Sequence, residues 1–324
     1  MIFREIPGKL FLMGEYAVMK PGHPALVLAV DRTLRVGISE YEGIRIEIPS
    51  WKIELDEAVL EADNSENPRL QFLCRLLEAM FLRLGERRSF HLVIEPHSRD
   101  LAGRDLGLGT SSALSVALAQ ALLPKEKRDS TRILALALGA HQDVQGGKGS
   151  GADVTTSWAG RSICYERVGQ GVPKFSLLAQ PRDFHFAAAF SGVSQRTASA
   201  VKAFEQLEAT RPLPVGRFCQ RSARLVTQAL DSWGSRGLST LRHVESAGKL
   251  MAELAKLLNA DAPVPEFLLA AAQIGGGVIK PSGSLGGDCY CLLANSGDNL
   301  ERVKKMAQGA GYEILDLKPV FGGR

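Results

Sequence analysis

Three glycine-rich segments hold most of the side chains in this 324-residue chain that could do chemistry. The first reads Asp-Leu-Gly-Leu-Gly-Thr-Ser-Ser-Ala over residues 105–113 and runs directly into an alanine- and leucine-rich stretch. Glycines let successive backbone N–H groups point into one concavity, and the dipole and N–H groups of a following helix favour an anion there. The segment therefore predicts a phosphate-binding loop.

This loop differs from the two common phosphate-binding motifs. It lacks the Gly-Lys-[Ser/Thr] ending of a Walker A loop, and Ser112 stands where a dinucleotide fingerprint has its third glycine. Thr110, Ser111 and Ser112 place hydroxyls in the first helical turn, where a hydroxyl can reach both a phosphate and its Mg²⁺. A plain helix start preceded by a glycine-rich turn is the alternative interpretation.

The second cluster, over residues 146–154, places an acidic residue directly after a flexible loop that is rich in N–H groups. Asp153 can therefore be aimed at a bound substrate, although it could equally serve as the N-cap of the next helix. The third cluster, over residues 275–289, holds too much glycine for a simple turn and precedes a strand. Close approach of the backbone to a ligand is the better explanation for it.

A fourth feature lies near the start of the chain. Pro7-Gly8-Lys9 is followed by Gly14-Glu15-Tyr16. A lysine beside a glycine can reach into a cleft as a point charge, although a solvated surface lysine is the default interpretation of this short motif.

The composition limits the class of protein. With 45% hydrophobic and 23% charged residues, the chain resembles an ordinary globular protein, which excludes disorder, collagen and a small disulfide scaffold. Its 39 basic and 35 acidic residues are interspersed, so neither nucleic acid nor a membrane is indicated as a partner, whereas a small anionic ligand is compatible. Five cysteines without a C-x-x-C pair favour a reducing cytosol and no zinc site. The opening residues lack a signal-peptide pattern, so we expect a cytoplasmic protein.

Hydrophobic periodicity predicts alternating strands and helices. Strands are expected at 24–30, 34–38, 44–48, 90–95, 161–166, 184–190, 289–293 and 312–317, and helices at 70–84, 113–123, 130–141, 198–207, 217–230, 238–258 and 300–308. Ser130 is a candidate N-cap, and 211–215 reads as a proline-interrupted loop. The aperiodic stretch 168–183 marks a domain boundary near residue 182. The class is α/β or α+β with two domains.

In this order and spacing, the four segments resemble the GHMP kinases, the family of galacto-, homoserine, mevalonate and phosphomevalonate kinases. The chain reads PGKLFLMGEYA over 7–17, GLGTSSA over 107–113 and KPSGSLGGDC over 280–289. The resemblance covers the whole chain. It implies an α+β, two-domain GHMP kinase-like architecture, with an N-terminal ATP-binding domain of mixed sheet and helices (1–182) and a C-terminal ferredoxin-like α/β domain (183–324).

Within the family, the phosphomevalonate kinase branch is the most similar. GEYAVMKPGHPALVLAVDR over 14–32 and AHQDVQGGKGSGADV over 140–154 resemble segments of that branch. The departures are Leu285 for a glycine, Thr110 for the first serine of the loop, Ser112-Ala113 for an alanine-rich pair, and Arg104-Asp105 where lysines often stand. Mevalonate kinases usually carry a carboxylate eleven residues before the catalytic aspartate as a Mg²⁺ ligand, and Gln142 stands there instead. A neutral amide is a poorer ligand for a hard cation.

The resemblance also implies roles for single residues. Asp153 and Lys9 are the catalytic pair, and Ser111 is the Mg²⁺ ligand. The ATP site is assigned to Arg104, Gly107, Leu108, Gly109, Thr110, Ser111 and Ser112. The substrate site is assigned to Glu15, Tyr16, His141, Lys148, Ser150, Arg196, Gly283 and Gly286, although a structural histidine is an equal alternative for His141 and a buried structural pair an alternative for Glu15 and Tyr16.

The expected activity is ATP- and Mg²⁺-dependent phosphorylation of 5-phosphomevalonate to 5-diphosphomevalonate in isoprenoid precursor synthesis, by a cytoplasmic monomer or homodimer. A mevalonate kinase, or another kinase of this family acting on a small alcohol or sugar, is the alternative, because the fold and the phosphate loop do not select the acceptor. A non-catalytic metabolite sensor is disfavoured, because both Lys9 and Asp153 are present.

Overall fold

The computed structural model divides the chain into two compact units that each draw on separate stretches of sequence. The residues it describes are 1–49, 53–56, 68–96, 106–123, 129–147, 149–169, 172–192, 197–233, 238–260, 264–283, 285 and 289–322. The first unit lies within Met1–Gly8, Arg32–Arg99 and Gly109–Gly160, and the second within Lys9–Asp31, Asp100–Leu108 and Arg161–Arg324. The division into contiguous domains 1–182 and 183–324 stays a prediction.

The first unit contains a mixed β-sheet. Its strands are the start of β1 (Ile2–Met13), the end of β2 (Pro24–Ser39), β3 (Ile44–Ile48), β4 (Ile53–Asp56) and β5 (Phe90–Pro96). Strand β3 pairs with β5 in parallel and with β4 in antiparallel orientation, and β5 pairs antiparallel with β2. Ile44, Ile46 and Ile48 alternate with partly exposed residues along β3, so the predicted half-buried strand is confirmed.

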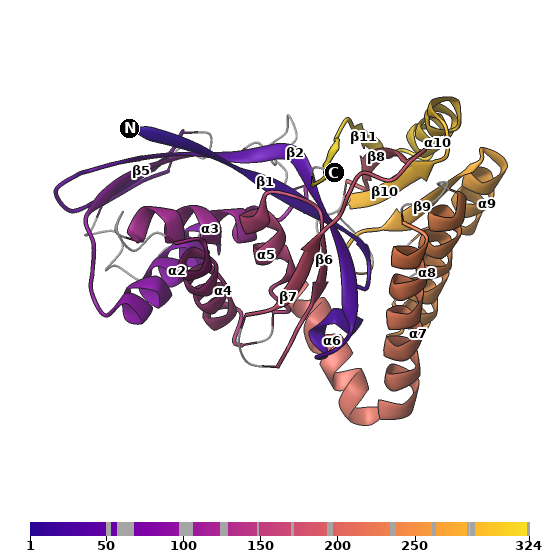
Figure 1. Ribbon diagram of the computed structural model, residues 1–324, viewed down its shortest axis with the longest axis horizontal. Coiled ribbons are helices and arrows are strands. Elements are labelled where there is room, and N and C mark those ends of the chain that lie inside the picture. The colour runs from indigo at the N-terminus through magenta and orange to yellow at the C-terminus, as the bar shows by residue number, and fades with distance from the viewer. Residues whose placement is uncertain are drawn as a thin grey trace. The chain divides into compact units, whose positions relative to one another are not determined.

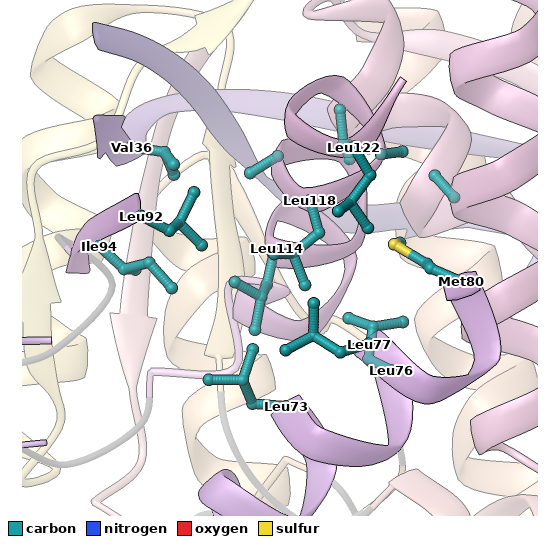
Figure 2. Packing of buried hydrophobic residues seen from close by; sticks show 14 of the residues in the cluster. Val36, Leu73, Leu76, Leu77, Met80, Leu92, Ile94, Leu114, Leu118 and Leu122 are labelled. Carbon is teal, nitrogen blue, oxygen red and sulfur yellow. The ribbon is translucent and has the colours of Figure 1, made fainter. Parts of the chain in front are cut away.

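Helices pack against this sheet and form one apolar core. They are α2 (Pro68–Leu84), α3 (Thr110–Leu122), α4 (Ser130–Val144) and α5 (Ala152–Ala159). Figure 2 shows side chains of the core from both layers: Val36, Leu92 and Ile94 from the strands, and Leu73, Leu76, Leu77, Met80, Leu114, Leu118 and Leu122 from α2 and α3. Burial of these apolar side chains is the main stabilising contribution to the unit.

Helix α3 lies at the centre of the first unit. It contacts α2, α4, α5 and β5, and nine of its thirteen residues are buried. A helix that is apolar on all sides must be covered on all sides, which explains its alanine- and leucine-rich sequence. It begins at Thr110, three residues earlier than its apolar run predicts, because Gly109 ends the preceding turn in a left-handed conformation.

The second unit contains an antiparallel sheet with helices around it. Its elements are the end of β1, η1 (Ala17–Met19), the start of β2, β6 (Ile163–Glu166), β7 (Lys174–Leu177), β8 (His185–Phe190), α6 (Thr197–Thr210), α7 (Pro212–Asp231), α8 (Leu238–Leu257), α9 (Glu266–Ile274), β9 (Gly277–Pro281), β10 (Cys289–Ala294), α10 (Gly297–Gly309), β11 (Glu313–Leu315) and β12 (Pro319–Val320). Strands β11, β8, β10 and β9 form the four-stranded sheet in that order. Helices α7 and α8 lie side by side (Figure 1), and α8 and α9 contact β9.

A second group of strands in this unit is built on β2. Strand β6 pairs antiparallel with the start of β2 and with β7. Strand β12 pairs with Ala29 and Val30 of β2. The chain therefore combines a partly parallel sheet in one unit with antiparallel pairing in the other, and the predicted α+β class is confirmed. The ferredoxin-like description of the C-terminal part stays a prediction.

Three local predictions are wrong. Residues 212–215 are the first turn of α7 rather than a loop, because proline is well tolerated at the start of a helix, where its missing N–H has no intrahelical acceptor. The first half of the third glycine cluster forms strand β9 instead of a loop. The N-cap of α4 is Asp129, whose carboxylate accepts a hydrogen bond from the Arg132 N–H, and not Ser130.

None of the helices in the described part of the chain is both long enough and apolar enough to cross a lipid bilayer.

We predict that Leu118→Ala lowers the free energy of unfolding by about 2–5 kcal/mol, because the change leaves a cavity in the core of the first unit. Leu82 is 83% exposed on α2, so Leu82→Ala is the matched control and should change stability by less than about 0.5 kcal/mol. Urea unfolding followed by circular dichroism measures both. Equal effects of the two substitutions would contradict the assignment of Leu118 to the core.

Candidate functional site

The start of α3 has the geometry of an anion-binding helix end in the first unit. Its N-cap, Gly109, has φ 82° and ψ 41°, and glycine adopts this left-handed conformation without steric cost. The Gly109 carbonyl accepts the Ala113 N–H at 3.1 Å, which closes the first helical turn. The N–H groups of a first turn point out of the helix end, together with the positive end of the dipole.

The hydroxyls predicted in this turn have different environments. Ser112 is fully buried, and its Oγ donates to the Gly109 carbonyl at 2.7 Å and lies 3.3 Å from Ser157 Oγ. Ser111 and Thr110 are only partly buried. Ser112 therefore shapes the turn, whereas Ser111 is better placed to contact a ligand.

His141 lies against Ser111 rather than in an open pocket. It is 1% exposed on α4, its Nε2 is 3.4 Å from Ser111 Oγ, and its ring packs edge-on against Phe72. The amide nitrogen of Gln145 lies 3.4 Å from the same Nε2. Ser111 and Gln145 therefore both contact Nε2 of this buried ring.

Asp153 is placed beside the start of α3 by helix α5. It lies in the first turn of α5, behind the left-handed N-cap Gly151, so it is not itself the N-cap. One turn later on the same face, Ser157 Oγ lies 3.3 Å from Ser112 Oγ and donates to the Pro7 carbonyl at 3.1 Å. The half-buried carboxylate accepts the Val154 N–H at 2.9 Å. The first unit therefore brings Ser111 and His141 together at the start of α3 and places Asp153 one helical turn from the contact between Ser112 and Ser157.

Lys9 and the residues before α3 meet in the second unit. The Lys9 N–H donates to the Leu108 carbonyl at 2.7 Å, and its Nζ donates to the Gly107 carbonyl at 3.5 Å. The ammonium group also lies 5.7 Å from the centre of the Phe11 ring. Lys9 is partly buried, so it is not the solvated surface lysine of the default interpretation. Its side chain is held by the phosphate-binding segment that the sequence predicts.

Glu15 and Tyr16 are buried and held within the second unit. Glu15, 4% exposed, forms an ion pair with Lys280, which is fully buried. Tyr16 Oη accepts the Leu285 N–H at 3.0 Å, and burial raises the pKa of this phenol to about 12. Sequence reasoning did not single out Lys280 as a functional residue. The available signal was a lysine inside an otherwise apolar strand, Gly-Val-Ile-Lys-Pro.

The structure describes only some of the remaining residues that the sequence predicts for the site. Ser150 precedes α5, and its Oγ accepts the Ala152 N–H at 3.3 Å. Gly283 has φ 83°, a conformation that favours glycine. Arg104, Lys148, Arg196 and Gly286 lie outside the described residues.

The oxygen donors at the start of α3 fit a magnesium ion better than a transition metal. Among the residues described, no group of three or more His, Cys, Asp or Glu side chains could hold a metal. Mg²⁺ needs few protein ligands, since it keeps several waters and uses one or two carboxylates plus substrate phosphates. The Ser111 hydroxyl and the Asp153 carboxylate are of the right chemical type, and Gln142 is half-buried on α4.

We predict that Tyr16 contributes stability that is lost at alkaline pH. Its pKa is about 12 in the folded chain and about 10 in an unfolded one, so the contribution is complete below pH 10 and disappears as the pH rises towards 12. Unfolding free energies measured in guanidinium between pH 9 and 11 should fall less steeply in Tyr16→Phe than in the unmodified protein. Tyr41→Phe, at an exposed position, is the control. Identical slopes for all three proteins would disprove the prediction.

Known proteins that resemble this chain match it almost end to end. A model of the GHMP kinases N terminal domain matches residues 72–161. A phosphomevalonate kinase of Streptomyces sp. (strain CL190) is 29% identical over 371 residues, covering 99% of this chain and 98% of that protein.

Solved structures share the fold at lower identity. Streptococcus pneumoniae phosphomevalonate kinase, in complex with phosphomevalonate and AMPPNP, has a TM-score of 0.78 at 22% identity, covering 99% of this chain and all of that one. The Lin0012 protein of Listeria innocua has a TM-score of 0.86 at 21% identity, covering 99% and 98%. L. major mevalonate kinase in complex with R-mevalonate has a TM-score of 0.73 at 18% identity, covering 100% and 97%.

Proposed function

Because this chain belongs to the GHMP kinase family and is a phosphotransferase, we propose that it transfers the γ-phosphoryl group of ATP to 5-phosphomevalonate, giving 5-diphosphomevalonate. The reaction belongs to isoprenoid precursor synthesis. Support for this acceptor comes from the Streptomyces phosphomevalonate kinase, which matches nearly the whole chain, and from the S. pneumoniae structure with phosphomevalonate and AMPPNP.

The observation that carries the proposal is the position of Asp153 in the first unit. Its helix contacts the start of α3 through Ser157 and Ser112, one turn from Asp153, which supports a role for this carboxylate next to a ligand bound at a helix end that favours anions. Phosphoryl transfer depends mainly on such positioning and on electrostatic stabilisation. A phosphate acceptor is largely ionised near neutral pH, so we propose that Asp153 aligns it rather than acting as a strong base.

The other roles are proposed for the residues of each unit by itself. The backbone of residues 107–112 would hold the nucleotide phosphates, and Ser111 would hold Mg²⁺, which would neutralise phosphate charge when bound. Lys9 would stabilise charge on the transferring group. Within the second unit, its Nζ donates to the carbonyl of Gly107 in the glycine-rich segment at 3.5 Å. Arg104, Lys148, Ser150, Arg196, Gly283 and Gly286 remain proposed ligand-binding residues.

Cellular setting and assembly are part of the same proposal. We propose a cytoplasmic enzyme that acts on small molecules as a monomer or homodimer, without nucleic acid or membrane partners. The nearly balanced charge, with 39 basic and 35 acidic residues, supports this choice of partners.

We predict that Asp153→Asn lowers kcat by at least about a hundredfold, because the amide has nearly the same shape but cannot carry the negative charge. AMPPNP affinity, measured by calorimetry, should change by less than about threefold, since the phosphate-binding helix end is untouched. Asp143→Asn is the control: Asp143 forms an exposed ion pair with Arg83 in the same unit, and its replacement should leave kcat unchanged. Undiminished turnover in Asp153→Asn would refute the proposed role.

We predict that phosphomevalonate is the preferred acceptor. Initial rates of ADP release, coupled to NADH oxidation, should give a kcat/KM at least about tenfold higher for phosphomevalonate than for mevalonate, galactose or homoserine, a ratio equivalent to about 1.4 kcal/mol of transition-state binding. Turnover of mevalonate without turnover of phosphomevalonate would favour the mevalonate kinase alternative. Fold alone does not separate the two, because structures with either name share it.

A further inference from the structure

A fully buried ion pair connects the end of β1 with the third glycine cluster inside the second unit. Lys280 is 0% exposed and Glu15 is 4% exposed. The Lys280 ammonium donates to Glu15 Oε1 and, at 2.7 Å, to the Pro281 carbonyl. Buried charges lose their hydration, so either group without the other would be strongly unfavourable. Each residue therefore requires its partner, although 265 positions separate them.

Stability alone does not account for this pair. Apolar side chains of similar volume are often as stabilising as a buried ion pair, or more so. An ion pair differs from them in being directional, because the ammonium and carboxylate must meet at hydrogen-bonding distance. The pair therefore fixes the position of β9 relative to the end of β1.

The residue next to Glu15 makes a second connection to the same cluster. Tyr16 has φ 60° and ψ −49°, a conformation that persists in a non-glycine residue only where its surroundings impose it. Its Oη accepts the Leu285 N–H at 3.0 Å, and its ring packs 5.2 Å from that of Phe204. The preceding Gly14 has φ 94°, and a Cβ there would lie 2.6 Å from Ala25 Cα. The backbone of this turn is thus locked while two side chains reach β9 and Leu285.

The same strand also holds the segment that precedes α3. The Lys9 N–H donates to the Leu108 carbonyl at 2.7 Å, six residues before Glu15. Cys289 Sγ donates to the Leu106 carbonyl at 2.9 Å, which links the other side of the third cluster to this segment. Strand β1 is therefore a common support for Lys9, for residues 106–108 and for the third glycine cluster.

We propose that Glu15, Tyr16 and Lys280 are positioning residues for phosphoryl transfer, which hold Pro281 and Leu285 of the third glycine cluster in a fixed relation to Lys9. They act through the backbone at Pro281 and Leu285 and do not contact the substrate, in contrast to the substrate-binding roles expected for Glu15 and Tyr16. The inference rests on the proposed function for the reaction that it serves, and on the described contacts of the second unit for the positioning.

The test uses two variants of the full chain that keep side-chain volume. Glu15→Gln combined with Lys280→Met removes both charges without leaving one of them unpaired. Tyr16→Phe removes only the hydroxyl that accepts the Leu285 N–H. Glu253→Gln, in an exposed ion pair with Arg221, and Tyr312→Phe, in the stacked pair with Tyr290, are the matched controls in the same unit.

We expect the double variant to unfold within about 3 °C of the unmodified protein, since no uncompensated charge remains, yet to show kcat reduced about tenfold per folded molecule. Tyr16→Phe should reduce kcat about fivefold, the rate equivalent of one neutral hydrogen bond. The controls should keep kcat within about twofold. A lower melting temperature of the variants with a normal kcat per folded molecule would show a merely structural role and overturn the proposal.

An unchanged kcat in Tyr16→Phe overturns the proposal as well. If the double variant does not fold, the kcat of Tyr16→Phe alone tests the positioning role. All rates are measured with whichever acceptor the unmodified protein phosphorylates. Failure of phosphomevalonate as acceptor in the unmodified protein would therefore count against the proposed function alone, and normal turnover in the variants would count against the positioning role alone.

Discussion

The contact between the first turn of α3 and the second turn of α5 is the constraint on which the chemistry of the first unit depends. Both helices begin behind a glycine in the left-handed conformation, Gly109 and Gly151, and neither N-cap carries a side chain that could occupy the helix end. Ser112 and Ser157, 3.3 Å apart, hold the two helices together in the buried interior. The positive end of the α3 dipole favours bound phosphate oxygens, and the Asp153 carboxylate is favoured in the first turn of α5, one turn before Ser157.

A different constraint organises the second unit, where strand β1 and the turn after it hold residues of the first and third glycine-rich segments by direct bonds. The Lys9 backbone pairs with Leu108, Glu15 pairs with Lys280, and the Tyr16 hydroxyl receives the Leu285 N–H. These bonds join stretches that are about 100 and about 270 residues apart in sequence. The glycine segments can then remain free of bulky side chains, because their positions are set by neighbours rather than by their own packing.

Local sequence pattern was sufficient for many of the regular elements, and insufficient wherever a distant partner decides the outcome. The isoleucines of β3 and the leucines of α2 predict their elements by spacing alone. Helix α5 has eight residues, too few for a helical period to be read, so Asp153 could be placed either as an N-cap or in a loop. Pro212 was ambiguous, since proline both interrupts helices and starts them. A lysine is usually exposed, so the sequence around Lys280 does not indicate that its side chain is buried. The burial is stable because Glu15, far away in the sequence, neutralises the charge.

The pairing of β12 with β2 affects the order in which the protein can assemble during synthesis. Pro319 and Val320 are paired with Val30 and Ala29 in the antiparallel register of the two strands. The Lys318 N–H donates to the Asp31 carboxylate, 287 residues away in sequence. A ribosome adding about 5–20 residues per second needs about 15 to 60 s to pass from one partner to the other. Throughout that interval the β12 side of β2 is without its native neighbour. The nascent polypeptide is therefore expected to expose an apolar strand that chaperones can recognise until translation reaches the last strand.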